Sequence, residues 1–206
     1  MKIILKSLLV LLCLLLVVFI STRAYFYFSN KNEITVYEIT ENEIETIREQ
    51  VSSLKSDTER KEFLESIFKL DQQVRTHISN IVQEEGYKSK QHKNALRAMD
   101  SVDTNNLYSI KLYLQTFDYP NKSSLGDIAS YTPLLVFHHK SSWNEFKEYY
   151  QYFRFAHSEG NISTKQLLSA LERKHDKIFN KRYSKPQTPI NQEEILTDIT
   201  KVLGLD

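Results

Sequence analysis

Apolar residues recur at helical spacing along most of the chain beyond about residue 40. Between Ser56 and Gly86 they occupy every third or fourth position, which places them on one face of a helix. Two further stripes follow, and the second of these is aromatic. The three stripes consist of Phe63, Ile67, Leu70, Val74, Ile78 and Ile81, then Leu107, Ile110, Leu114 and Phe117, then Phe146, Tyr149, Tyr150 and Phe153. Strand-like alternation is absent beyond a short segment at Ile34–Tyr37, so the pattern predicts an all-α domain of six or seven helices.

Capping motifs mark where the helices begin. In each motif, a small polar residue precedes a Glu or Gln by three positions, so that the pair can satisfy free backbone N–H groups of a first turn. The predicted helices run from Thr40 to about Leu54, from Ser56 to Glu85, from Ser142 to about Gly160, from Ser163 to about Tyr183 and from Asn191 to Gly204. Between them, Thr132–Pro133 predicts a break between two short helices, because proline is disfavoured inside a helix.

The N-terminal segment has the composition of a membrane anchor. Ile3 to Ile20 is apolar apart from Lys6 and Ser7, and an aromatic cluster follows at Tyr25–Phe28. About 20 mostly apolar residues span a bilayer, and aromatic rings collect at its interfaces. A cleaved signal peptide is the alternative, although Arg23 makes a poor cleavage site. The sequence thus predicts an anchor or signal peptide over residues 1–28, a tether with a first helix over 29–55, and a helical domain over 56–206.

Composition narrows the classes of partner. The N-terminal lysines favour a cytoplasmic N-terminus, so we expect a single-pass membrane protein whose body is extracytoplasmic and whose membrane partner is bound through residues 3–28. Lys and Arg number 27 against 26 Asp and Glu, which gives no basic surplus for binding nucleic acid. Cys13 is the single cysteine, which excludes a disulfide framework. No phosphate loop, nucleophile motif or metal-ligand spacing occurs, so we expect no cofactor and no metal.

Two groups of polar residues are candidates for chemistry. Asp71 and Arg75 are four residues apart on a predicted helix, so their side chains can meet as a boundary ion pair or as a polar site. His138 and His139 are adjacent, and successive helical residues point about 100° apart, so the two rings do not readily bind one metal. A histidine hydrogen-bonded at a helix end is the favoured interpretation.

These residues belong to an ordered set of short motifs that resembles a known bacterial family. The set consists of Asp71-Gln72-Gln73-Val74-Arg75, Asp103-Thr104-Asn105-Asn106, Asp118-Tyr119-Pro120, Ser124-Leu125-Gly126 and His138-His139. It is similar to the D-Q-x-x-R, D-x-x-N, G-W-P, Ser–Gly and Q-H motifs of the family called domain of unknown function 6624. The resemblance covers residues 60–187, and it implies a fold and candidate positions rather than an activity.

The chain departs from the family pattern at several positions. Asp118 and Tyr119 stand where the family has Gly and Trp, and His138 stands where it has Gln. The family's later D-R pair and Q-x-Y-G-T-Q segment are matched only in part, at residues 172–174 and 183–187. If those motifs complete an active site, the chain lacks part of it.

The sequence therefore predicts an extracytoplasmic binding or interaction module with an unknown protein or small-molecule ligand. The resemblance pairs Asp71, Arg75, Asn106 and His139, which we expect to share one polar site; His138 and Tyr119 are further candidates for binding. A hydrolase-type acid/base enzyme is the alternative, with Asp71, His139 and Asp103 as its catalytic candidates. The third alternative is a structural or immunity-type protein that contacts a partner through the aromatic helix.

Overall fold

The computed structural model describes residues 37–184 and 191–205. Within these ranges the protein is all-α, with seven helices and no strand, as the apolar pattern predicts. The helices are α2 (Glu41–Ser53), α3 (Asp57–Glu85), α4 (Lys90–Phe117), α5 (Lys122–His139), α6 (Trp143–Ser158), α7 (Thr164–Phe179) and α8 (Gln192–Leu203). The expected anchor at residues 3–28 and the segment at 34–36 lie outside the described residues. None of the described helices is long and apolar enough to cross a membrane.

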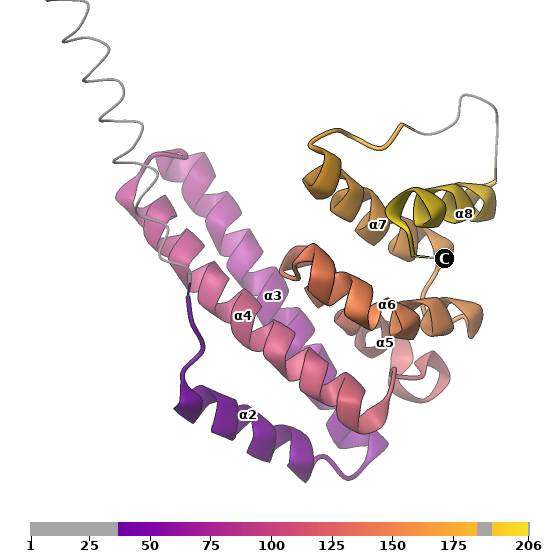
Figure 1. The fold of residues 1–206 in the computed structure, drawn as a ribbon. Helices are drawn as coiled ribbons and strands as arrows, with labels where there is room; N and C mark the ends of the chain where they lie inside the picture. The colour runs from indigo at the N-terminus through magenta and orange to yellow at the C-terminus, as the bar shows by residue number, and fades with distance from the viewer. Residues whose placement is uncertain (1–36, 185–190, 206) are drawn as a thin grey trace, which may run out of the picture. The chain divides into compact units, whose positions relative to one another are not determined.

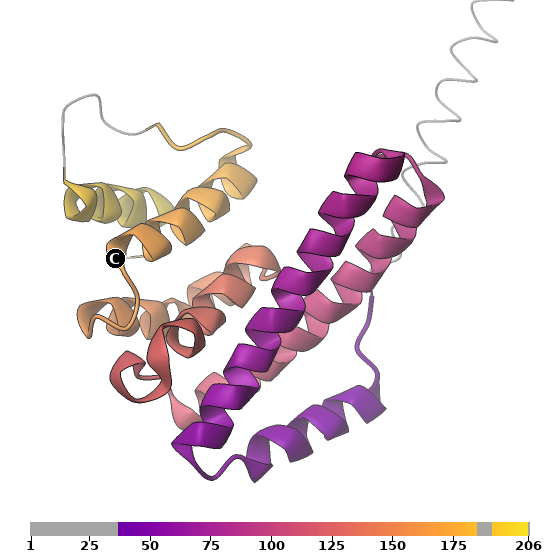
Figure 2. The same ribbon diagram turned by 180° about the vertical axis from the view of Figure 1, so that it is seen from behind.

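The two longest helices, α3 and α4, form an antiparallel hairpin (Figure 1). Helix α2 packs beside α4, and α5 packs against both α3 and α4. Seen from behind, α3 runs in front of α4 along the length of the hairpin (Figure 2). Helix α7 joins α5, α6 and α8 on the other side of the domain. The close packing of α3, α4 and α5 matters for function, because it brings together polar residues that are far apart in the sequence.

The predicted helix starts are confirmed, and each has a physical cause. Full capping boxes begin α2, α3, α6 and α7, whereas α8 begins with Asn191, whose side chain accepts from the Glu194 backbone N–H. Gly86 caps the C-terminal end of α3 and Gly204 that of α8, both with positive φ. Helix α7 ends at Phe179, followed by the cap residue Asn180 in the left-handed region, and therefore stops short of the predicted Tyr183. The first four N–H groups of a helix lack partners inside it, so these caps determine where each helix begins.

The predicted break at Thr132–Pro133 is wrong. Pro133 lies inside α5, and the non-helical residue is Gly126, with a φ of 87° that favours glycine. Proline leaves a carbonyl of the preceding turn without its usual partner. Close to this point the Thr132 hydroxyl donates to the Ile128 carbonyl at 2.8 Å, and the Ser130 hydroxyl donates to the Asp127 carbonyl at 3.1 Å. The helix nonetheless continues through Pro133, and the backbone leaves the helical conformation at Gly126 instead.

The buried face of α3 differs from the predicted stripe. Phe63, Leu64 and Ile67 are buried, but Leu70 is 43% exposed, and Asp71 beside it is only 1% exposed. At this turn of α3, the inward-facing residue is therefore Asp71, and not Leu70 as the apolar pattern predicts. The physical reason is that His139 of α5, together with Arg75 and Gln72 of α3, donates hydrogen bonds to that carboxylate.

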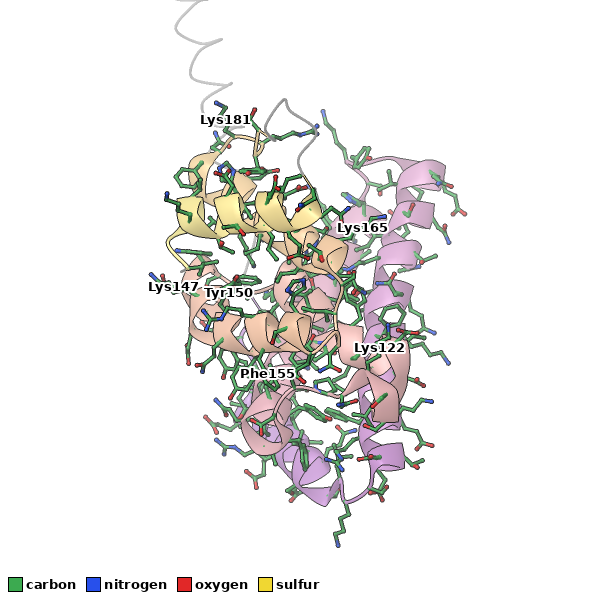
Figure 3. The ribbon with its side chains drawn as sticks, turned by 90° about the vertical axis from the view of Figure 1, so that its right-hand side faces the viewer. Lys122, Lys147, Tyr150, Phe155, Lys165 and Lys181 are labelled. Carbon is green, nitrogen blue, oxygen red and sulfur yellow. The ribbon has the colours of Figure 1, made fainter. Side chains whose placement is uncertain are left out.

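The aromatic stripe of α6 is confirmed as core. Phe146, Tyr149, Tyr150 and Phe153 are all buried, and the Phe146 and Phe153 rings stack 5.3 Å apart. Tyr150 and the exposed Phe155 are labelled on this helix in Figure 3. The stripe is thus used for packing inside the domain, and a partner in contact with α6 would meet other residues of that helix.

Candidate functional site

A buried carboxylate, Asp71, is the centre of a polar cluster where α3, α4 and α5 meet. Its Oδ1 lies 2.9 Å from His139 Nδ1 on α5 and 3.0 Å from Arg75 Nη2, one turn along α3. Gln72 Nε2 donates to Asp71 Oδ2 at 2.7 Å. The expected proximity of Asp71, Arg75 and His139 is therefore confirmed, although the 68 residues between Asp71 and His139 hide it from local sequence patterns.

Arg75 joins this carboxylate to a second one. Its Nη2 also donates to Asp103 Oδ1 on α4 at 2.8 Å, and its Nη1 lies 3.3 Å from the Met99 sulfur. The Asp103 side chain is 8% exposed, and within the described residues Arg75 is its one hydrogen-bond partner. We refer to Asp71, Arg75, Asp103 and His139 as the polar cluster. It contains two carboxylates, a guanidinium and an imidazole, contributed by three helices.

The two carboxylates have opposite electrostatic environments. Burial raises the pKa of Asp71, but hydrogen bonds and charges from His139 and Arg75 outweigh burial, and the pKa lies below its usual value of 3.8. Burial also raises the pKa of Asp103, and there it prevails over the attraction of Arg75, helped by the negative charge of Asp71. For Arg75, burial lowers the pKa, but the two carboxylates raise it by more, so the pKa lies above its usual value and the guanidinium stays charged. Asp71 is thus the firmly ionised member of the pair.

His139 is oriented by Asp71. A carboxylate can only accept hydrogen bonds, so the imidazole Nδ1 carries the shared proton. The other ring nitrogen, Nε2, makes no hydrogen bond to any described residue, and the side chain is 14% exposed. An imidazole held through one nitrogen with the other nitrogen free is suited to accept a hydrogen bond or a proton from a bound molecule.

His138 and Tyr119 do not join the polar cluster. Burial, followed by the charges of His139, Arg173, Lys174 and Lys177, lowers the pKa of His138 to about 3, so its ring is neutral at pH 7. The two histidine rings lie edge to face with their centroids 5.1 Å apart, but it is His139 that hydrogen-bonds to Asp71. Tyr119 is buried, packs edge to face on Phe153, and has a pKa raised by burial.

Asn106 makes no hydrogen bond to the polar cluster and lines a groove instead. This groove of about 340 Å³ lies between α2, α3 and α4, and we call it the α2 groove. Its lining residues are Glu43, Thr46, Ile47, Gln50, Phe63, Ser66, Ile67, Leu70, Asn105, Asn106 and Ser109. A groove of this size falls in the range of small-molecule sites.

Two buried polar atoms in the lining of the α2 groove lack partners. Asn106 is 5% exposed, and its Nδ2 makes no hydrogen bond in the described part of the chain. The same is true of Asn105 Oδ1, whereas Asn105 Nδ2 donates to Glu43 Oε1 at 3.1 Å. That bond fixes the orientation of the Asn105 amide, because a carboxylate cannot donate. Buried polar atoms are nearly always paired, so two orphans beside one groove require an explanation.

Lys174 is the main buried polar residue that the sequence does not reveal. Its side chain is 1% exposed, and Nζ donates to the Phe137 carbonyl at 2.9 Å, the Ser141 carbonyl at 2.6 Å and the Ser141 hydroxyl at 2.8 Å. It therefore caps the carboxyl end of α5, next to the two histidines. Burial, reinforced by Lys177 and Arg173, lowers the pKa of Lys174 to about 7. A buried lysine in an otherwise amphipathic helix gives no signal in a hydropathy pattern.

No family model matches the chain, and neither a curated protein nor a solved structure gives a significant match. The resemblance to domain of unknown function 6624 thus stays a hypothesis. Within the described residues, no three His, Cys, Asp or Glu side chains are grouped so that they could hold a metal ion. What the protein does must therefore be inferred from the geometry of the polar cluster and the α2 groove.

Proposed function

We propose that the protein is a membrane-anchored, extracytoplasmic binding domain whose ligand occupies the α2 groove. The observation that carries this proposal is the buried Asn106 amide, whose Nδ2 has no partner within the described residues. Leaving a buried donor unsatisfied costs about 1–3 kcal/mol. A ligand in the groove that draws the Asn106 amide toward it and accepts from Nδ2 would remove this cost, and its binding free energy would include that gain.

The composition of the α2 groove supports a ligand with both apolar and polar parts. Ile47, Phe63 and Ile67 are buried and supply an apolar floor. Hydroxyl and amide side chains along the same groove supply hydrogen-bonding groups, namely Thr46, Gln50, Ser66, Asn105, Asn106 and Ser109. Such a mixture, with a few placed polar groups on an apolar surface, is typical of small-molecule sites.

The polar cluster has a supporting role in this proposal. Asp71 and Ile67 are four residues apart on α3, and Asp103 and Asn106 are three apart on α4, so the cluster and the groove occupy neighbouring turns of the same two helices. The ion pairs of Arg75 with Asp71 and Asp103 join α3 to α4. The cluster thereby holds together two of the three helices that line the groove.

The membrane anchor is the second part of the proposal. Residues 3–28 supply the apolar length and the aromatic flank of a single span, and Lys2 and Lys6 favour a cytoplasmic N-terminus. The ligand would then be met on the extracytoplasmic side of the membrane.

An acid/base enzyme is the second candidate, and one observation favours it. Asp71 orients His139 and leaves Nε2 free, which is the arrangement of a histidine general base held by a carboxylate. In this alternative Asp71 positions the ring, Nε2 takes the proton from the substrate, and Arg75 orients an anionic group. His139→Asn, which keeps a donor near the Nδ1 position and removes Nε2, would abolish such an activity with little change in stability.

A thermal-shift screen of the full-length protein tests the binding proposal. Small molecules of separate chemical classes (sugars, amino acids, N-acylated compounds, nucleosides) would be added to the wild type and to Asn106→Asp. A ligand that binds only the folded state stabilises it and so raises the melting temperature. At a ligand concentration of a hundred times the dissociation constant, this stabilisation is about 2.7 kcal/mol. We expect at least one class to stabilise the wild type and to lose this effect in Asn106→Asp. The proposal fails if every stabilising compound acts equally on both proteins.

A further inference from the structure

The turn between α3 and α4 is the exposed end of the helical hairpin. In Figures 1 and 2 no other described helix lies beside it. Tyr87 in this turn is 75% exposed, the highest value among the exposed large hydrophobic side chains of the described residues. Its carbonyl accepts from Nδ1 of the buried His92 at 2.6 Å, and the two rings pack edge to face, 5.7 Å apart. Tyr87 is therefore held at its base and presents its ring to the surroundings.

Basic side chains gather beside this tyrosine. Four of them, Lys88, Lys90, Lys93 and Arg97, follow the turn with no Asp or Glu between them. All four are exposed, and none forms an ion pair within the described residues. We refer to Tyr87 and these four residues as the hairpin tip.

The basic residues of α4 share its outward face. Lys90, Lys93 and Arg97 are at positions i, i+3 and i+7, which lie on one side of a helix. His92 and Ala95, on the opposite side, are buried. The end of α3 contributes two glutamates, so the turn and its flanks keep four positive charges against two negative ones. The whole chain has 27 basic and 26 acidic residues, so this surplus is local to the hairpin tip.

The chain before Tyr37 limits how far the hairpin tip can stand from a membrane. The Tyr37 backbone N–H donates to Asp100 Oδ2 at 2.9 Å, so the described chain starts beside α4. Nine residues lead from an anchor that ends at residue 28 to Tyr37, and extended chain spans at most ~3.3–3.6 Å per residue, which limits this distance to about 30 Å. Lys90 is ten residues from Asp100 on α4, or about 15 Å along the helix, which is within that reach.

A membrane surface with anionic lipids fits the chemistry of the hairpin tip. Tyrosine rings collect at membrane–water interfaces, because the ring is apolar and its hydroxyl stays in contact with water. Each basic residue close to an anionic leaflet favours contact by a factor of about five. A tether keeps the local concentration of the tip at the surface high, so a modest attraction per residue is sufficient. A nucleic acid would use the same charges, but it would leave the exposed tyrosine and the short tether without a role.

On these grounds we infer that the hairpin tip is a second membrane contact, in which Tyr87 enters the interface and the four basic residues lie against the headgroups of anionic lipids. The inference rests on the anchor in the proposed function, because the tether brings the tip to the surface. It also has a consequence for the α2 groove. Asn106 is sixteen residues from Lys90 on α4, so the contact holds the groove up to about 24 Å away from the lipid, open to the extracytoplasmic side.

Fluorescence quenching in reconstituted vesicles tests the inference. The full-length protein carries Cys13→Ser, and a dye is attached through Gln91→Cys beside the hairpin tip or through Thr116→Cys, an exposed control position near the other end of α4. The vesicles contain phosphatidylcholine alone or mixed with phosphatidylglycerol, and a lipid with a nitroxide near its headgroup is the quencher. We expect the dye at position 91 to be quenched about threefold more in the anionic vesicles. Salt at about 1 M should remove this difference, because it screens charges beyond about 3 Å, and the dye at position 116 should show no difference.

Variants link the quenching to the hairpin tip. The combination of Lys90→Gln, Lys93→Gln and Arg97→Gln should reduce quenching in anionic vesicles to the level of neutral ones. Tyr87→Ser removes the ring but no charge and should weaken the contact by a smaller factor. The control makes the same change in net charge at three exposed lysines on α6, on α7 and after α7, which Figure 3 labels, namely Lys147→Gln, Lys165→Gln and Lys181→Gln. It should leave the quenching unchanged.

Flotation of the same vesicles separates this inference from the proposed anchor. If the protein floats with neutral vesicles but the dye at position 91 is quenched no more in anionic ones, the anchor stands and the tip contact is overturned. If it floats only with anionic vesicles, and only while the three basic residues of α4 are intact, the tip contact stands and the anchor is overturned. Flotation with neither overturns both. If a DNA duplex, and not anionic lipid, changes the emission of the dye, the tip binds nucleic acid and its assignment to the membrane is wrong.

Discussion

Removing Arg75 is the sharpest perturbation of the polar cluster. Arg75→Ala eliminates the ion pairs with Asp71 and Asp103 at once. Asp71 keeps His139 and Gln72 as partners, whereas Asp103 loses the one partner it has among the described residues. The variant therefore leaves one buried carboxylate, Asp103, uncompensated.

The expected loss follows from the burial of that carboxylate. Breaking a buried ion pair by removing one member costs about 3–5 kcal/mol. The Arg75 side chain is 27% exposed, so water can replace part of the guanidinium, and Asp103 can take up a proton. We therefore expect the lower end, about 3 kcal/mol, which is a large share of the ~5–15 kcal/mol stability of a domain.

Urea unfolding of the full-length protein, followed by circular dichroism, measures this loss. Lys61→Ala is the matched control, because Lys61 and Glu65 form an exposed pair at the same spacing on the same helix. That control should change the free energy of unfolding by less than about 0.5 kcal/mol. The double variant Arg75→Ala with Asp103→Asn should recover about 1–2 kcal/mol, since the neutral amide is cheaper to bury than the orphaned charge. A loss for Arg75→Ala no larger than that of Lys61→Ala would refute this reasoning.

Four further predictions follow from the charges and the N-terminus. The pKa of folded Asp71 lies below 3.8, so its stabilisation relative to Asp71→Asn should be present above pH 3.8 and disappear as the pH falls below it. The pKa of folded Asp103 lies above 3.8, so Asp103→Asn should instead gain on the wild type as the pH rises from 3.8; urea unfolding across the acid range checks both signs, and parallel trends would contradict them. Folded Lys174 releases its proton near pH 7 and the unfolded residue near 10.5, so the wild type should gain stability over Lys174→Met between these values, and a constant difference would show that the buried amine is not perturbed. Mass spectrometry of the protein from its native host should find an uncleaved N-terminus; a mature chain that begins near Tyr25 would show a signal peptide instead.

The helix ends could be predicted from the sequence because their causes are local. A capping box such as Ser56 with Glu59 satisfies N–H groups within one turn, and a residue such as Gly86 ends a helix through its own backbone freedom. The kink in α5 could not be placed in the same way. Pro133 gave the stronger local signal, but α5 continues through it, and the backbone leaves the helical conformation at Gly126.

The polar cluster could be predicted only in part. The spacing of Asp71 and Arg75 allowed their contact, and the resemblance paired them with His139. Hydrophobicity nonetheless assigned Leu70 to the interior and Asp71 to its edge, because the burial of Asp71 depends on packing against α5, whose His139 is 68 residues away in sequence. Lys174 was missed for the same reason, since its three acceptors lie 33 and 37 residues away in sequence.

The α2 groove was beyond sequence analysis, although Asn106 was among the candidates for binding. Its walls come from α2, α3 and α4, and its volume depends on how α2 packs beside α4. The local signal was the Asn105–Asn106 pair, two amides of modest helix propensity inside a long helix. Tertiary packing turns that pair into two orphaned atoms beside a groove.

The free energy of unfolding of Asn106→Leu, measured without ligand, tests the central claim most directly. If Asn106 keeps an unpaired donor for a ligand, an apolar side chain of similar size should be harmless or stabilising, with a gain of up to about 1–3 kcal/mol. The exposed Asn94→Leu on the same helix supplies the baseline. The account predicts that Asn106→Leu is at least as stable as the wild type; a loss of more than about 1 kcal/mol would show that the amide is already paired and serves only the fold.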